Sequence, residues 1–171
     1  MKNIKQNTVI RATRQKTNRA ADRLREYRKQ KAMVPKLAPD TLRIIPLGGQ
    51  DGIGEKNMIV VEYNNDALIL DAGFELGIDI PGINYAIPVT EYLETIKHKI
   101  KGYVISHGHM DHIGALVHVV PEYPALIFGS RFTIGMVEAQ FEKQENPDAF
   151  KPTTQVVKMD QHERIKLGAL T

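Results

Sequence analysis

The chain has 171 residues, a hydrophobic content of 42%, a net charge of +3 and no cysteine. A chain of this length and composition is expected to form one domain of ordinary size, and the absence of cysteine excludes disulfides and thiolate metal sites. The longest apolar runs, residues 58–61 and 67–70, are far too short to span a bilayer, and the N-terminus has no apolar signal segment. We therefore expect a cytoplasmic protein with no membrane partner.

The charge is divided unevenly along the chain. Residues 1–39 include 12 Lys and Arg against two acidic residues, whereas residues 40–171 include 11 basic and 18 acidic residues. Within the basic part, residues 17–30 have a thin apolar stripe, so this segment is either a marginal helix or disordered. A proline-containing linker follows it. We predict a basic N-terminal arm over residues 1–40 and a folded domain over residues 41–171.

Short β-rich runs alternate with segments of helical periodicity after the linker. Strand propensity and turn chemistry predict strands over residues 42–47, 57–63, 67–71, 102–106, 125–128, 155–159 and 164–167. A glycine-rich turn over residues 48–54 follows the first strand and lacks the Lys-Ser/Thr ending of a nucleotide-binding loop. Apolar spacing predicts helices over residues 88–96, 113–120 (ended by Pro121) and 130–143. Hairpin strands followed by alternating strands and helices indicate an α/β layered domain.

A histidine-rich run, SHGHMDH at residues 106–112, directly follows a predicted buried strand. In extended backbone alternate side chains share a side, so His107 and His109 can reach one metal ion together. Asp111 and His112 lie at the turn into the next helix, where they can point at a second ion. Imidazole and carboxylate ligands suit zinc or manganese, and two ions about 3.5–4 Å apart can catalyse hydrolysis. Three of six histidines in one segment argue against a chance surface cluster.

The pattern His-x-His-x-Asp-His after a strand resembles the signature of the metallo-β-lactamase superfamily. Flanking stretches resemble the ribonuclease J family within it, namely residues 45–49, 54–58, 71–73, 101–102 and 129–138. The resemblance implies a metallo-β-lactamase-type αββα sandwich, of which this chain is the N-terminal half. The ligands that complete the family's two metal sites, and its inserted beta-CASP domain, would lie beyond Thr171. We therefore expect this segment alone to contain only part of the metal-binding site and to be a poor nuclease.

The resemblance also implies a role for each residue of the motif. His107 and His109 bind one ion, Asp111 and His112 bind the other, and Asp111 and His112 are also catalytic. Asp71, at the end of an earlier strand, orients the ligands from behind; an ordinary turn aspartate is the alternative. Two divalent ions are the implied cofactors, with zinc expected first and manganese or magnesium as alternatives. The other histidines are expected to have no chemical role: His98, His118 and His162.

A metal-dependent 5′–3′ exoribonuclease with endoribonuclease activity is the function that the resemblance implies, in RNA decay and in rRNA and mRNA maturation. RNA is the implied substrate, and a homodimer or homotetramer, beside other RNA-decay proteins, is the implied assembly. The arm offers cations for RNA phosphates, with a solvated tail as the alternative; these are Arg11, Arg14, Lys16, Arg19, Arg23, Arg25, Arg28 and Lys29. Two alternative functions remain: another hydrolase of the superfamily acting on DNA, a lactone or a thioester, and a truncated non-catalytic RNA-binding protein.

Overall fold

The computed structural model describes residues 35–48, 55–78, 81–158 and 163–171. The chain divides into two compact units, Met1–Lys36 and Leu37–Thr171. The predicted helix at residues 17–30, the basic residues of the arm and most of the glycine-rich turn lie outside the described residues. The predictions for those segments therefore stay predictions, and the folded domain is the second unit.

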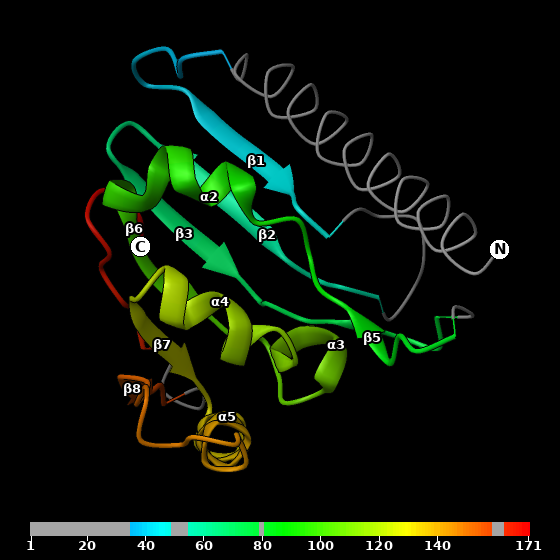
Figure 1. Ribbon diagram of the computed structural model, residues 1–171. Coiled ribbons are helices and arrows are strands. Elements are labelled where there is room, and N and C mark those ends of the chain that lie inside the picture. Colours follow the sequence, from blue (N-terminus) through cyan, green and yellow to red (C-terminus); the bar gives the residue numbers. More distant parts are fainter. Residues whose placement is uncertain (1–34, 49–54, 79–80, 159–162) are drawn as a thin grey trace, which may run out of the picture. The chain divides into compact units, whose positions relative to one another are not determined.

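A six-stranded mixed sheet forms the centre of the domain, with strand order β1-β2-β3-β6-β7-β8 (Figure 1). The strands are β1 (Leu42–Pro46), β2 (Ile59–Tyr63), β3 (Asp66–Leu70), β6 (Ile100–Val104), β7 (Leu126–Gly129) and β8 (Thr154–Val156). The first three strands pair antiparallel, and β3, β6, β7 and β8 pair parallel. The carboxyl ends of β3, β6 and β7 therefore meet at one edge, where an open α/β sheet usually places its functional loops.

Short helices and a small hairpin connect these strands. The helices are α2 (Glu91–Ile96), the 3-10 helix η2 (Lys97–Lys99), α3 (Met110–Ile113), α4 (Leu116–Glu122) and α5 (Arg131–Glu142). The hairpin consists of β4 (Glu75–Leu76) and β5 (Tyr85–Ala86), which form a separate two-stranded sheet. In the part of the chain that the structure describes, no helix is long and apolar enough to cross a bilayer.

The main apolar core lies between one face of the sheet and helices α2, α4 and α5. Strands β2 and β3 bury every second residue, as expected when one face of a sheet is covered. The inward residues of strands and helices form one apolar cluster that includes Val60, Ile69, Tyr103, Leu93, Leu116 and Val137. This packing confirms the predicted α/β layered domain, and it holds the loops at the sheet edge in fixed positions.

The opposite face of the sheet is apolar and less completely covered. Leu68, Leu70, Val104 and Phe128 line a hollow of about 710 Å³ on this face, together with residues of the 163–171 segment. On the edge strand β1, Ile44 is 61% exposed. One face of this sheet is therefore packed by helices, while the other keeps apolar side chains near its surface.

One predicted strand and the predicted end of one helix are wrong. Residues 164–167 do not form a strand, because the backbone of Leu167 pairs with that of Leu170 in a local turn and so joins no ladder of the sheet. The helix predicted over residues 113–120 corresponds to α4, which begins at Leu116, and the separate short helix α3 precedes it. Pro121 lies inside α4 instead of ending it, since Tyr123 N–H still donates to the carbonyl of Val119 at 3.0 Å. The hairpin β4–β5 was not predicted, because its strands are too short to give an alternating pattern.

Candidate metal centre

The histidine-rich run lies at the carboxyl edge of the sheet, between β6 and α3. His109 is still extended, with φ −73° and ψ 151°, and the helix begins at the next residue. The three imidazoles gather there: the ring centroid of His107 lies 4.6 Å from that of His109 and 4.0 Å from that of His112. The structure therefore brings together the three predicted histidine ligands.

Backbone hydrogen bonds tie this run to two segments that are distant in the sequence. Ala72 N–H donates to the carbonyl of His112 at 2.7 Å, and Asn57 N–H donates to that of Asp111 at 3.0 Å. A Cβ atom added to Gly73 would lie only 1.5 Å from the Asp111 carbonyl oxygen, so only glycine permits this close approach. The loops after β3 and before β2 thus hold the start of α3 in place.

Asp71 follows β3 and lies behind the histidines. Its carboxylate accepts hydrogen bonds from Ser106 N–H at 2.8 Å and Ser106 Oγ–H at 2.9 Å, and from His112 Nδ1 at 2.8 Å. Its backbone has φ 58°, a left-handed conformation that Asp tolerates better than most residues and that recurs at functional sites. The contacts that an orienting role requires are therefore present, while the role itself stays a prediction.

The Asp71 carboxylate bears on how the neighbouring imidazoles are oriented. An ionised carboxylate can only accept, so a neutral His112 donates from Nδ1 to Asp71 and turns Nε2 away from it. Ser106 Oγ contacts both Asp71 and His107 Nδ1, the latter at 3.0 Å, and so links the His107 ring to the same carboxylate. A carboxylate that contacts a ligand imidazole in this way is typical of metal-binding histidines.

The nitrogen and oxygen atoms that could bind metal occur in two close pairs. His107 Nε2 lies 3.1 Å from His109 Nδ1, and His112 Nε2 lies 3.2 Å from Asp111 Oδ2. The edge of a zinc tetrahedron with metal–nitrogen distances of 2.0–2.1 Å is about 3.3 Å. Among the described residues, no three His, Asp or Glu side chains are grouped around one position for an ion. The described residues therefore offer two pairs of possible ligand atoms, and the assignment of each pair to a divalent ion stays a prediction.

Two neighbours of this site were missed in the sequence. Ser106 links Asp71 to His107, and its only signal is its place directly before the histidine run. The side-chain amide of Asn57 lies 3.2 Å from Asp111 Oδ2 and 3.3 Å from His112 Nε2. No spacing rule connects Asn57 to a motif 55 residues away, so only the fold reveals this contact.

The described histidines outside the run lie apart from the site. His118 Nε2 is 3.0 Å from the hydroxyl of Tyr85, and the two rings stack with centroids 5.6 Å apart. His98 is exposed on η2. His162 lies outside the described residues. That His98 and His118 have no chemical role stays a prediction.

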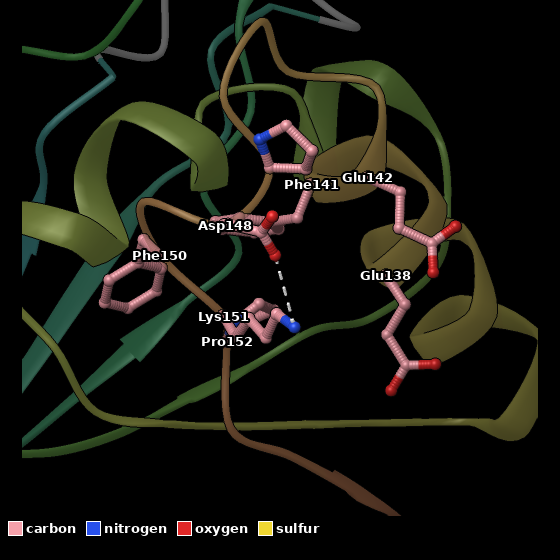
Figure 2. Close-up of a pocket in the computed structure, with 8 residues that line it drawn as sticks. Glu138, Phe141, Glu142, Asp148, Phe150, Lys151 and Pro152 are labelled. Carbon is pink, nitrogen blue, oxygen red and sulfur yellow. Dashed lines mark ion pairs between the residues drawn. The ribbon is translucent and has the colours of Figure 1, made fainter.

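A hollow of about 340 Å³ beside α5 is chemically different from the histidine cluster (Figure 2). Its lining combines an apolar floor, including Phe141 and Phe150, with the carboxylates of Glu138, Glu142 and Asp148. Asp148 forms an exposed ion pair with Lys151 at 3.4 Å. No predicted metal ligand lines this hollow, and its acidic character does not favour binding of phosphate groups.

Comparison with known proteins agrees with the resemblance seen in the motifs. The ribonuclease J of Thermus thermophilus is 36% identical over 136 residues, covering 75% of this chain and 23% of the relative. That of Synechocystis sp. is 36% identical over 113 residues, covering 65% and 18%. The ribonuclease J 2 of Staphylococcus saprophyticus is 39% identical over 98 residues, covering 57% and 17%. The chain thus spans less than a quarter of the length of these relatives.

Among solved structures, a diphosphatase from the PhnP family matches with a TM-score of 0.45 and 22% identity, over 66% of this chain and 40% of that one. The family model described as the metallo-beta-lactamase superfamily matches residues 51–163, which is more than half of the chain. This match and the mixed sheet confirm the predicted partial metallo-β-lactamase fold, and the predicted similarity to ribonuclease J is confirmed as well. The chain belongs to the metallo-β-lactamase superfamily.

Proposed function

We propose that the protein containing this chain is a metal-dependent phosphodiesterase of the ribonuclease J type. One observation carries the proposal: the possible metal ligands of the histidine run form two pairs, with ligand atoms 3.1 Å and 3.2 Å apart, at the edge of the sheet. Similarity to ribonuclease J relatives supports RNA as the substrate. Because those relatives are much longer than this chain, activity is assigned to the complete protein.

In this proposal His107 and His109 hold one divalent ion, while Asp111 and His112 hold the other and are catalytic. Imidazole and carboxylate donors without thiolate suit zinc, with manganese or magnesium as alternatives. When bound, two such ions activate water and stabilise negative charge on phosphate oxygens. The task of Asp71 is to keep the imidazole of His112 in the tautomer that presents Nε2.

The finer assignment follows the family resemblance of the motifs. We assign 5′–3′ exonuclease activity, with endonuclease activity as a second mode, in RNA decay and in rRNA and mRNA maturation in the cytoplasm. We assign a homodimer or homotetramer to the complete protein, in contact with other RNA-decay proteins. The basic arm is assigned to RNA phosphates, an interaction that weakens as the salt concentration rises.

An RNA digest with matched variants tests the proposal. The complete gene product is loaded with Zn²⁺ or Mn²⁺. It is then incubated separately with 5′-monophosphorylated RNA, with DNA of the same sequence and with a lactone. We expect metal-dependent cleavage of RNA. His109→Ala should lower the rate by about 100-fold or more, because losing even an outer partner of a metal ligand costs 10–100-fold.

His98→Ala is the matched control, since it removes an exposed histidine outside the cluster. It should leave the rate unchanged. Cleavage that survives His109→Ala would remove this residue from the site. Turnover of the lactone or of DNA, with RNA left intact, would instead assign the chain to another hydrolase class of the superfamily.

A further inference from the structure

Two apolar side chains near the start of α5 are exposed. Phe132 is 75% exposed and Met136, one turn later, is 40% exposed. On the other side of the same helix Ile134, Val137 and Phe141 are buried in the core, so the helix does not need its outer apolar residues for folding. Phe132 and Met136 both lie beside Gly108, and neighbouring exposed apolar side chains can mark a binding surface where a single one does not.

This surface borders the histidine run. A Cβ atom placed on Gly108 would lie 3.3 Å from Met136 Cγ and 3.7 Å from Phe132 Cε1. Gly108 stands between His107 and His109, so the ring edge of Phe132 lies beside the loop that carries the first pair of donor atoms. A ligand that reaches those donors from this side therefore passes the aromatic ring.

The charge at this end of α5 favours an anionic ligand. The first turn contains Arg131 and no acidic residue, and Ser130 caps it by accepting a hydrogen bond from Thr133 N–H at 3.2 Å. A cation in the first turn of a helix is disfavoured by the helix dipole, so Arg131 is placed at some cost to helix stability. Within the described residues, the exposed Arg131 forms no ion pair that would offset this cost.

The later turns of α5 are acidic where they line the hollow, in contrast to the first turn. Glu138 and Glu142 of α5 line it, together with Asp148 (Figure 2). A polyanion is therefore repelled along the later turns of α5 and attracted at the first turn. An aromatic face next to an exposed guanidinium matches the chemistry of a nucleotide, which combines a flat base with a phosphate.

We propose that Phe132 is a base-stacking residue: it stacks on a base of the RNA strand whose phosphate lies at the His107–His109 pair, while Arg131 contacts a neighbouring phosphate. This inference rests on the proposed ribonuclease function and deepens it. Stacking on one aromatic side chain accepts any base. Phe132 therefore positions the strand for cleavage without selecting a sequence.

An added indole tests stacking directly, because residues 1–171 contain no tryptophan. In the complete protein, Phe132→Trp adds one indole at this position, and a stacked base would quench the fluorescence that it adds over wild type. The probe is a 5′-monophosphorylated, phosphorothioate RNA of about ten nucleotides, added in the presence of Zn²⁺. Ile44→Trp is the matched control, because Ile44 is 61% exposed on β1, at the far side of the sheet. We expect saturable quenching at position 132 and none at position 44.

Phe132→Ala separates base stacking from a structural role. It should weaken binding of this RNA roughly 5- to 150-fold, the range for loss of one stacked base, and raise KM for cleavable RNA more than it lowers kcat. An RNA with abasic sugars throughout should bind wild type and Phe132→Ala equally, and Phe132→Tyr should restore binding of normal RNA.

Each other outcome has a distinct meaning. Suppose that wild type cleaves RNA in a metal-dependent way and that normal RNA binds wild type and Phe132→Ala equally tightly. This result would overturn the stacking role and leave the proposed function unaffected. Failure of wild type to bind or cleave RNA would remove both. A lower oligomeric state of Phe132→Ala, with RNA affinity unchanged, would identify the surface as a contact between protein copies and overturn the inference.

Discussion

Replacing Asp71 with Asn tests how the histidines are oriented. The substitution keeps the size of the side chain, and Asn tolerates the left-handed backbone at φ 58° at least as well as Asp does. It removes the negative charge that accepts hydrogen from His112 Nδ1 at 2.8 Å and from Ser106 N–H at 2.8 Å. His112 then loses the partner that holds the hydrogen on Nδ1, and the tautomer that presents Nε2 is no longer favoured.

The expected effect is on metal affinity more than on folding. Loss of a partner that orients a metal-binding histidine lowers metal affinity by about 10–100-fold, or about 1.4–2.7 kcal/mol. The Asp71 side chain is only 14% exposed and that of His112 only 19%, so water cannot readily replace the lost contact. We expect Asp71→Asn to lower Zn²⁺ affinity within this range while the circular dichroism spectrum stays unchanged.

Isothermal titration with Zn²⁺ measures this affinity, and Asp66→Asn is the matched control. Asp66 begins the same strand, its side chain is 17% exposed, and its carboxylate likewise accepts a backbone N–H, from Ala169 at 2.7 Å. It contacts none of the histidines, so its replacement should leave Zn²⁺ affinity unchanged. Equal loss in both variants, or no loss in Asp71→Asn, would refute the orienting role of Asp71.

Two further predictions concern stability, each measured by urea denaturation. Burial raises the pKa of Glu62, but hydrogen bonds from Lys99 and Tyr92 and the charges of Lys99 and Arg43 outweigh burial and lower it overall. Its ionised form therefore stabilises the fold fully above the ordinary pKa of about 4.3 and less as the pH falls through the lowered value. Glu62→Gln should cost about 1–3 kcal/mol at neutral pH; a cost that does not shrink in acid would contradict this reasoning. Gly73→Ala should cost about 3 kcal/mol or more, because the new methyl group meets the Asp111 carbonyl at 1.5 Å. Gly135→Ala, whose new methyl group meets nothing within 4 Å beyond its chain neighbours and the backbone of its own helix, should instead stabilise α5 by about 0.5–1 kcal/mol. Equal effects of the two glycine substitutions would show that the close approach at Gly73 is not limiting.

Local patterns predicted the central elements well. The strands β2, β3, β6 and β7 and the helix α5 follow from alternation, helical periodicity and the Ser130 cap, since each depends on residues close in the chain. The predicted strand at residues 164–167 failed because strand formation needs a partner in the sheet, which a single segment does not specify. The order of strands is likewise a tertiary property, determined by packing between distant segments.

The candidate site likewise combines residues that the local sequence predicts with contacts that only the tertiary fold reveals. The four predicted ligands lie within six residues, and one strand-to-helix loop brings His107, His109 and His112 together. Ser106 and Asn57 contribute contacts that depend on the parallel pairing of β3 with β6 and on the loop before β2. Phe132 reaches the site only because α5 packs beside that loop, so its exposed ring could not be placed from the sequence.

Crystals of the protein soaked in Zn²⁺, with diffraction recorded on both sides of the zinc absorption edge, would locate the ions directly. We predict two anomalous peaks: one within bonding distance of His107 Nε2 and His109 Nδ1, and a second beside Asp111 Oδ2 and His112 Nε2. Zinc bound elsewhere on the chain, with these four side chains making no contact with it, would contradict the proposed metal centre.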